Sequence, residues 1–210
     1  MRSLDPTRPV VHIHIPKTGG TTVRSILRAR WPRLNEDGQC YSEHFDSTLG
    51  FTVESFTGCT LPDVQMVVFL RDPFEQALSF YAYWQSATGV DLTIHGQTHT
   101  RPETLAAFLQ ANLLDWFAFL PGCRSDYPEA LRQFAFVSLM PYFTHDARRL
   151  ARWIGLPRTT SIPRLLDTRA FRRQASYDGL RDLRESYIAA HPDECALYEY
   201  ACDLRAYQSP

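Results

Sequence analysis

A predicted strand, a glycine turn and a predicted helix follow one another near the amino end, and this succession constrains the fold most. The residues Val10–Ile15 are rich in β-branched side chains and predict a buried strand. Lys17–Gly20 is a flexible turn, and apolar side chains recur at helical spacing over Thr21–Arg30. A strand that leads through a turn into a helix indicates an α/β protein with a largely parallel sheet.

Strands and helices continue to alternate along the chain. Further strands are predicted at 64–70 and 134–139, and further helices at 103–120, 144–154, 177–190 and 193–204. A helix is also predicted to begin after Asp72, as the N-cap, with Pro73 as its first residue and Glu75 in a capping box, and to run to about Ser86. Residues 87–101 are predicted to form a loop.

Composition narrows the function classes. With 210 residues, 44% of them apolar and 21% charged, we expect a single domain over residues 1–210. The net charge of −1 argues against nucleic acid or a membrane surface as a partner, and no apolar run is long enough to span a bilayer. The five cysteines are scattered without a CxxC pair, which argues against a zinc site or a disulfide framework. We expect a reduced, cytoplasmic protein.

Lys17 is the single lysine among 22 basic residues. A compact ammonium differs from a guanidinium in size, hydration and reach, so this position is a candidate for chemistry that arginine does not perform. It precedes Gly19 and Gly20 in a turn whose N–H groups lie at the positive end of a helix dipole, a setting suited to phosphate. The hydroxyls of Thr18, Thr21 and Thr22 can complete this cradle, although the order differs from the GxxxxGK[ST] loop of nucleoside triphosphate enzymes.

A second candidate motif follows the predicted strand at 64–70. Arg71 leaves this strand at its carboxyl end, where α/β folds bind ligands, and Ser79 lies two turns into the next helix. One alternative for Arg71 is a salt bridge with Asp72 or Glu75. Asp72 also resembles a carboxylate that holds magnesium in kinases, although a helix cap explains it more simply.

Two segments resemble those of sulfotransferases that use 3'-phosphoadenosine 5'-phosphosulfate (PAPS), most closely carbohydrate 2-O and 6-O sulfotransferases and their bacterial relatives. His14–Thr22 looks like the 5'-phosphosulfate loop, and Val67–Pro73 with Ser79 resembles the 3'-phosphate-binding strand and helix. Residues 136–157 and 197–199 are similar to later blocks of the family, apart from Ser138 and Pro141, where glycine and glutamate are usual. The matches leave out residues 31–63 and 87–130.

The resemblance implies a P-loop-like three-layer fold with a central, mainly parallel sheet flanked by helices. It also implies transfer of a sulfuryl group from PAPS to a hydroxyl, without a metal, with 3'-phosphoadenosine 5'-phosphate (PAP) as product. Lys17 then stands on the leaving-group side, the loop Lys17–Thr22 holds the 5' end of the cofactor, and Arg71 and Ser79 hold its 3'-phosphate. The acceptor is expected to be a sugar or a small natural product.

In-line transfer also needs a general base on the acceptor side. His44 resembles the histidine that several family members use, and Glu43 or Asp46 can orient it. His14, at the entrance to the loop, is the second candidate, although packing under the loop explains it equally well.

The sequence does not assign individual roles in two groups of residues. The arginine-rich stretch 148–173 is expected to be mostly solvated, with one or two members near the cofactor. Five aromatic residues are expected in the core rather than in an acceptor wall: Tyr81, Tyr83, Trp84, Trp116 and Phe117. A small-molecule kinase and a PAPS-binding module without turnover are the alternatives to a sulfotransferase, and the sequence does not predict the oligomeric state.

Overall fold

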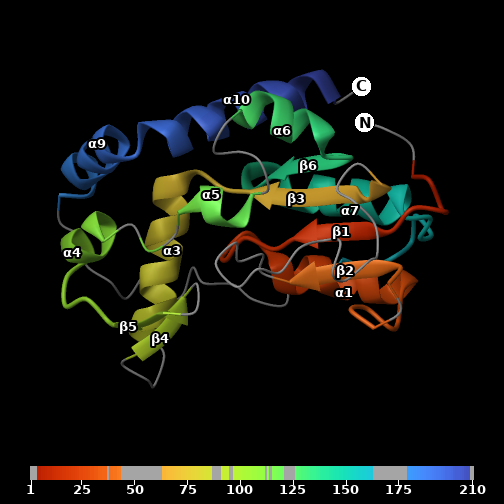
Figure 1. The fold of residues 1–210 in the computed structure, drawn as a ribbon, viewed down its shortest axis with the longest axis horizontal. Helices are drawn as coiled ribbons and strands as arrows, with labels where there is room; N and C mark the ends of the chain where they lie inside the picture. The colour runs from red at the N-terminus through yellow and green to blue at the C-terminus, as the bar shows by residue number, and fades with distance from the viewer. Residues whose placement is uncertain are drawn as a thin grey trace.

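The computed structural model describes residues 4–36, 38–43, 63–86, 91–94, 97–111, 113, 115–120, 126–162 and 179–208 (Figure 1). Its elements, in chain order, are β1 (Val10–Ile13), α1 (Gly20–Arg30), β2 (Cys40–Glu43), β3 (Gln65–Leu70), α3 (Pro73–Ser86), β4 (Asp91–Ile94), β5 (Gln97–Thr100), α4 (Leu105–Gln110), α5 (Trp116–Phe119), α6 (Tyr127–Gln133), β6 (Phe136–Leu139), the 3-10 turn η3 (Met140–Tyr142), α7 (Phe143–Trp153), α9 (Leu180–Ala190) and α10 (Pro192–Gln208).

The main sheet of the described chain is parallel, with strand order β2-β1-β3-β6. Val10 of β1 aligns with Cys40 of β2 on one side and with Gln65 of β3 on the other. The chain leaves β1 toward β2 and leaves β3 toward β6, so the strand order reverses between β1 and β3. In open α/β sheets, ligands bind at the carboxyl ends of the strands beside such a reversal.

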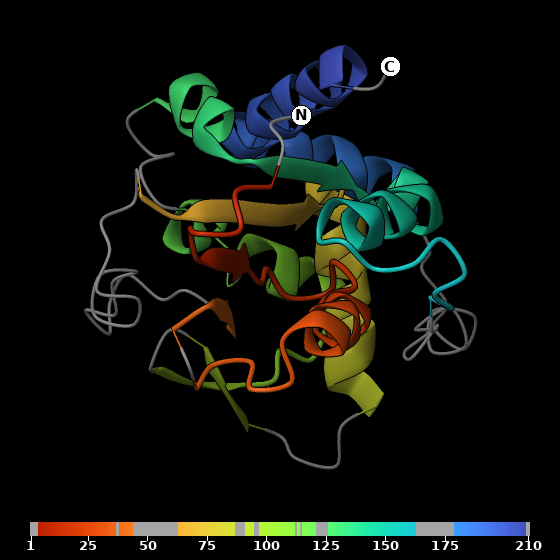
Figure 2. The same cartoon turned by 90° about the vertical axis from the view of Figure 1, so that its right-hand side faces the viewer.

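Helices cover both faces of this sheet, which confirms the predicted three-layer α/β fold. Val11, Ile13 and Val68 face a cluster that includes α5, α6 and α10, whereas Val67 and Phe69 face α1 and α7. Figure 2 shows α1 and α7 together on one side of the stacked strands. Because both faces are covered, β1, β3 and β6 are buried along their whole lengths, as their apolar sequences require.

Helix α3 stands across the carboxyl ends of the strands (Figure 1). It begins as predicted, because the Asp72 carboxylate accepts a hydrogen bond from the Glu75 N–H at 2.9 Å and Pro73 is its first residue. It ends at Ser86, also as predicted. A separate apolar cluster holds α3 against α4 and α9, with Phe74 and Tyr187 at 5.8 Å between ring centroids.

Two predictions about the middle of the chain are wrong. The predicted loop at 87–101 contains the antiparallel strands β4 and β5, in which Asp91 aligns with Thr100 and Ile94 with Gln97. These strands are polar, so their apolar pattern is weak, but their threonines favour extended backbone.

The single predicted helix over 103–120 is instead two short helices, α4 and α5. The Asp115 side chain accepts a hydrogen bond from the Phe117 N–H at 2.9 Å, so it caps a new helix within the apolar run. Strand β2 and helix α6 were not predicted, while the strand at 134–139 and the three later helices are confirmed within a few residues.

A buried carboxylate joins β6, α7 and α10. Asp146 accepts hydrogen bonds from the Ser138 hydroxyl at 3.0 Å, from Arg149 at 3.0 Å and from two nitrogens of Arg205 at 2.8 and 3.0 Å. Burial alone would raise the pKa of Asp146, but these hydrogen bonds and one from His145 outweigh it and hold the pKa well below its usual value. Ser138 is therefore part of this structural cluster.

We expect Asp146→Asn to lower the free energy of unfolding by about 3 to 5 kcal/mol, because it leaves Arg149 and Arg205 without their shared anion in a buried place. The folded-state pKa of Asp146 is depressed, so the loss should be complete above about pH 4, the range of an unfolded aspartate, and should shrink as the pH falls below it. Urea unfolding at pH 7 and pH 3 measures both values. Asp182→Asn, on the exposed face of α9, should change stability by less than about 0.5 kcal/mol.

Candidate functional site

The loop between β1 and α1 ends in a backbone that suits glycine. Gly19 is the N-cap of α1 with a φ of +83°, and a Cβ there would lie 2.4 Å from the Phe143 ring. Because Gly19 has no side chain, no side chain caps the helix. Among the described residues, no acceptor is found for the N–H groups of Gly20 and Thr21. Within the described part of the chain, the helix thus presents its positive end without an internal anion.

The predicted second candidate base, His14, lies against the start of α1. A Cβ added at Gly20 would lie 1.8 Å from Nε2 of His14, so the imidazole occupies the space that this glycine leaves. His14 also stacks on His12 at 5.7 Å between ring centroids, and Nδ1 of His12 is 2.7 Å from the Ser42 hydroxyl oxygen. The rings of His12, on β1, and of His14, one residue after β1, therefore stack on each other beneath the loop.

The three threonines of the motif lie in different surroundings. Thr18 is buried and its hydroxyl donates to the Ile15 carbonyl at 2.8 Å, which closes the loop on itself. Thr22 is also buried, and its N–H donates to the Gly19 carbonyl at 3.0 Å. Thr21 is exposed. Of the three hydroxyls, that of Thr21 is the one that faces solvent at the helix start.

The second predicted motif contacts the first directly. Nη1 of Arg71 donates to the Lys17 carbonyl at 3.3 Å, although the two residues are 54 positions apart. Nε2 of Gln76 donates to the neighbouring Pro16 carbonyl at 2.8 Å, and the Trp116 indole donates to the other end of the Gln76 amide. The structure thus brings the predicted loop and Arg71 together. Gln76 was not singled out from the sequence. Its role depends on its burial in the first turn of α3, which the sequence does not reveal.

Arg71 also forms the salt bridge that was considered as an alternative. Its Nη2 is 3.6 Å from Oε2 of Glu75, one turn along α3. Both contacts place the Arg71 guanidinium between the loop and the start of α3. An ion pair of this length with a half-exposed glutamate is weak enough for a phosphate to compete with it.

Lys17 has the least ordinary conformation in the loop. Its φ is +66°, in the left-handed region, and its ammonium lies 4.3 Å from the centroid of the Tyr83 ring. Burial, and then the nearby charge of Arg71, lower the pKa of Lys17 to about 8. No carboxylate pairs with this ammonium among the described residues. The lysine is therefore a partly desolvated cation held by an aromatic face.

Tyr83 was predicted to lie in the core, but its side chain is exposed. It is 43% exposed, whereas Tyr81, Trp84 and Trp116 are buried as expected. Ser79 is fully buried on the same helix. It lies three residues after Gln76 and four before Tyr83, so the three share one stripe of α3 that faces the loop. This stripe brings the predicted Ser79 to the side of α3 that touches Lys17.

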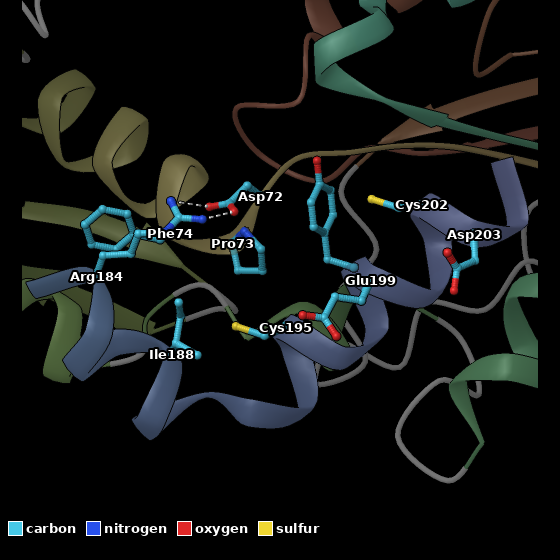
Figure 3. A pocket seen from close by; sticks show the side chains of 10 residues that line it. Asp72, Pro73, Phe74, Arg184, Ile188, Cys195, Glu199, Cys202 and Asp203 are labelled. Atoms are coloured by element: carbon cyan, nitrogen blue, oxygen red, sulfur yellow. Dashed lines mark hydrogen bonds and ion pairs between the residues drawn. The ribbon is translucent and has the colours of Figure 1, made fainter. Parts of the chain in front are cut away.

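Asp72 is engaged by a residue that sequence reasoning missed. Its carboxylate lies 2.6 Å from Nη2 of Arg184 on α9, in addition to capping α3 (Figure 3). The pair forms one wall of a cavity of about 490 Å³ between the start of α3, α9 and α10. Glu199 and Asp203 line the same cavity, so its charge does not suit an anionic cofactor.

Some predicted site residues lie outside the described part of the chain. They include His44, the first candidate base, and its possible partner Asp46, as well as Arg164, Arg169, Arg172 and Arg173. Strand β2 ends at Glu43, which aligns with Ile13 at the carboxyl edge of the sheet. Within the described part of the arginine-rich stretch, Arg149 binds Asp146 and is thus structural.

In the described part of the chain, positively charged groups gather at the carboxyl ends of β1 and β3. The open start of α1, Lys17 and Arg71 supply positive charge there, while Asp72 is paired with Arg184 and Glu75 with Arg71. The site lies where the strand order reverses, which is the expected ligand position in this architecture. None of the described helices is long and apolar enough to cross a membrane.

Comparisons with known proteins found similarity among solved structures only. No protein-family model matches this chain, and no curated protein sequence matches it. Among solved structures, the chain is similar to the crystal structure of mouse sulfotransferase SULT7A1 complexed with PAP. The TM-score is 0.47 and the identity 13%, over 93% of this chain and 89% of that one. A similarity of this size does not identify a ligand or an acceptor for this chain.

We expect the amine of Lys17 to react with an acylating reagent at half its maximal rate near pH 8 in the folded protein, and near pH 10.4 in urea. Because Lys17 is the only lysine, peptide mass spectrometry separates its acylation from that of the terminal amine. Arg71→Ala should move the midpoint upward, since it removes a like charge. Arg28→Ala, exposed on α1, should not move it, and a native midpoint near 10.4 would contradict the desolvated site.

Proposed function

We propose that this protein transfers a sulfuryl group from PAPS to a hydroxyl of a sugar or small natural product. The contact between the two motifs that resemble PAPS sulfotransferases supports this proposal most. Arg71 reaches the Lys17 carbonyl, so the residues proposed for the 3'-phosphate and the 5'-phosphosulfate adjoin one another. Both motifs lie at the strand-order reversal, where the fold class binds nucleotides.

The described residues fit such a cofactor. The N–H groups at the start of α1 have no acceptor among the described residues, as an anion site requires. In the proposed complex, Lys17 and these N–H groups hold the 5' end, and Arg71 and Ser79 hold the 3'-phosphate. When bound, PAPS supplies the sulfuryl group and the leaving nucleotide. The role of Lys17 is to neutralise charge that develops on the leaving side.

His44 is the proposed general base, with Glu43 or Asp46 orienting it. It would take the proton of the attacking hydroxyl, as its resemblance to the family's histidine implies. His14 is the less suitable candidate, because its ring packs against Gly20 beneath the loop.

The structure favours this reaction over the kinase alternative. A kinase of the type considered would use the Asp72 carboxylate to hold magnesium, but these oxygens cap α3 and bind Arg184. A metal there would have to displace both partners. Only a measurement of turnover distinguishes the proposed enzyme from a module that binds PAPS without turnover. The direct test is therefore PAP formation from PAPS in the presence of pooled hydroxyl acceptors.

We expect Arg71→Ala to weaken PAP binding by roughly 2 to 4 kcal/mol, because a charge-assisted contact to the 3'-phosphate is lost. Binding of adenosine 5'-phosphosulfate, which has no 3'-phosphate, should change no more than a few-fold. Calorimetric titration of both nucleotides measures the difference.

Glu75→Gln is the matched control, because it releases Arg71 from its salt bridge without removing the guanidinium. It should leave PAP binding unchanged or slightly tighter. Equal losses for both nucleotides in Arg71→Ala would instead show that Arg71 acts only by holding the Lys17 carbonyl.

We expect Lys17→Arg to fold normally and bind PAP, but to form PAP from PAPS roughly 100-fold more slowly. The charge is retained, whereas the wider guanidinium forks across oxygens instead of meeting the single bridging oxygen. Initial rates and thermal stabilisation by PAP should be measured on the same preparation. The reverse change at an exposed site, Arg28→Lys, should leave the rate unchanged, and a normal rate in Lys17→Arg would show that Lys17 supplies charge only.

A further inference from the structure

Tyr83 is the exposed aromatic residue of a helix whose other large aromatic side chains are buried. It is 43% exposed, while Phe80, Tyr81 and Trp84 lie in the cluster between α3, α4 and α9. One face of its ring carries the Lys17 ammonium at 4.3 Å from the centroid. An exposed tyrosine whose ring covers the only lysine of the chain has a use other than core packing.

Helix α3 and Arg71, two residues before it, hold the loop at three points. Arg71 binds the Lys17 carbonyl, Gln76 binds the Pro16 carbonyl, and the Tyr83 ring covers the tip of the Lys17 side chain. The first two contacts fix the backbone, including the left-handed φ of Lys17. The third fixes the end of a side chain that otherwise has four freely rotating bonds.

We propose that Tyr83 is a positioning residue that holds the Lys17 ammonium at the mouth of the loop until an anion takes it over. This inference rests on the proposed function, in which that anion is the 5' end of PAPS or PAP. The ring face attracts the cation without neutralising it, so the ammonium stays charged and close to the open start of α1. A carboxylate in the same place would compete with the anion far more strongly.

The proposal separates the ring of Tyr83 from its hydroxyl. The attraction comes from the aromatic face, so Tyr83→Phe should keep the contact and Tyr83→Leu should abolish it. Tyr142→Leu is the matched control. Tyr142 is 50% exposed and also covers a cation, Arg205, but it has no contact with Lys17 among the described residues.

The first measurement observes the contact itself. Protein labelled with ¹³C at the lysine Cε gives one lysine signal, because the chain has one lysine. The ring current of Tyr83 should shift the attached protons upfield in the unmodified protein, in Tyr83→Phe and in Tyr142→Leu, but not in Tyr83→Leu. An unshifted signal in the unmodified protein, or the same shift in Tyr83→Leu, would overturn the proposal.

The second measurement titrates PAP into the same samples. Release of the ammonium to the anion should remove the upfield shift as PAP saturates the site. If PAP binds and the shifted signal persists, the proposal fails while the proposed function stands. If PAP does not bind although the shift is present, the proposed function fails and the contact between Lys17 and Tyr83 stands.

The third measurement separates positioning from acceptor binding. Because the ring acts before the anion binds, Tyr83→Leu should raise the KM for PAPS about three- to tenfold and leave the rate of PAP formation at saturating PAPS within about twofold, and Tyr83→Phe should be normal. A Tyr83→Leu variant with an unchanged KM for PAPS and a raised KM for the acceptor would assign the ring to acceptor binding and would overturn the proposal.

Discussion

Two hydrogen bonds join the start of α3 to the β1–α1 loop, and the arrangement of the candidate site depends on them. Arg71 and Gln76 donate to the carbonyls of Lys17 and Pro16, two groups that no strand or helix would satisfy. The Trp116 indole holds Gln76 in turn. Trp116 lies on α5, on the face of the sheet opposite α1. Because of these bonds, Lys17, Ser79 and Tyr83 converge on one place although they come from distant parts of the sequence.

The same region arranges its charges so that the positive groups dominate at the loop. Two acidic residues near it have basic partners: Asp72 pairs with Arg184, and Glu75 with Arg71. Lys17 has an aromatic ring instead. A phosphate that displaced Glu75 from Arg71 would leave that glutamate in solvent, at a small cost, because the pair is partly exposed.

The sequence predicted the parts of this site whose causes are local. The strand, turn and helix over 10–30 and the capped start of α3 follow from β-branched runs, glycine and capping chemistry within a few residues. The contacts of Tyr83 with Lys17 and of Arg184 with Asp72 were not predicted. They arise because α3 crosses the ends of the strands and α9 packs on α3. The division of the predicted helix 103–120 depended on Asp115, whose capping role an apolar run conceals.

The backbone at position 17 gives an independent reason to assign a function to its side chain. A non-glycine residue in the left-handed region is strained by about 1 kcal/mol or more, and lysine lacks the short polar side chain that relieves this in asparagine or aspartate. Glycine would remove that cost and would also avoid burying an ammonium, which lowers the pKa of Lys17 to about 8. Folding alone therefore favours glycine here. Lys17 nevertheless bears both the backbone strain and the burial of its ammonium, in a chain whose other basic residues are all arginine. This indicates that the function of position 17 is to supply an ammonium group.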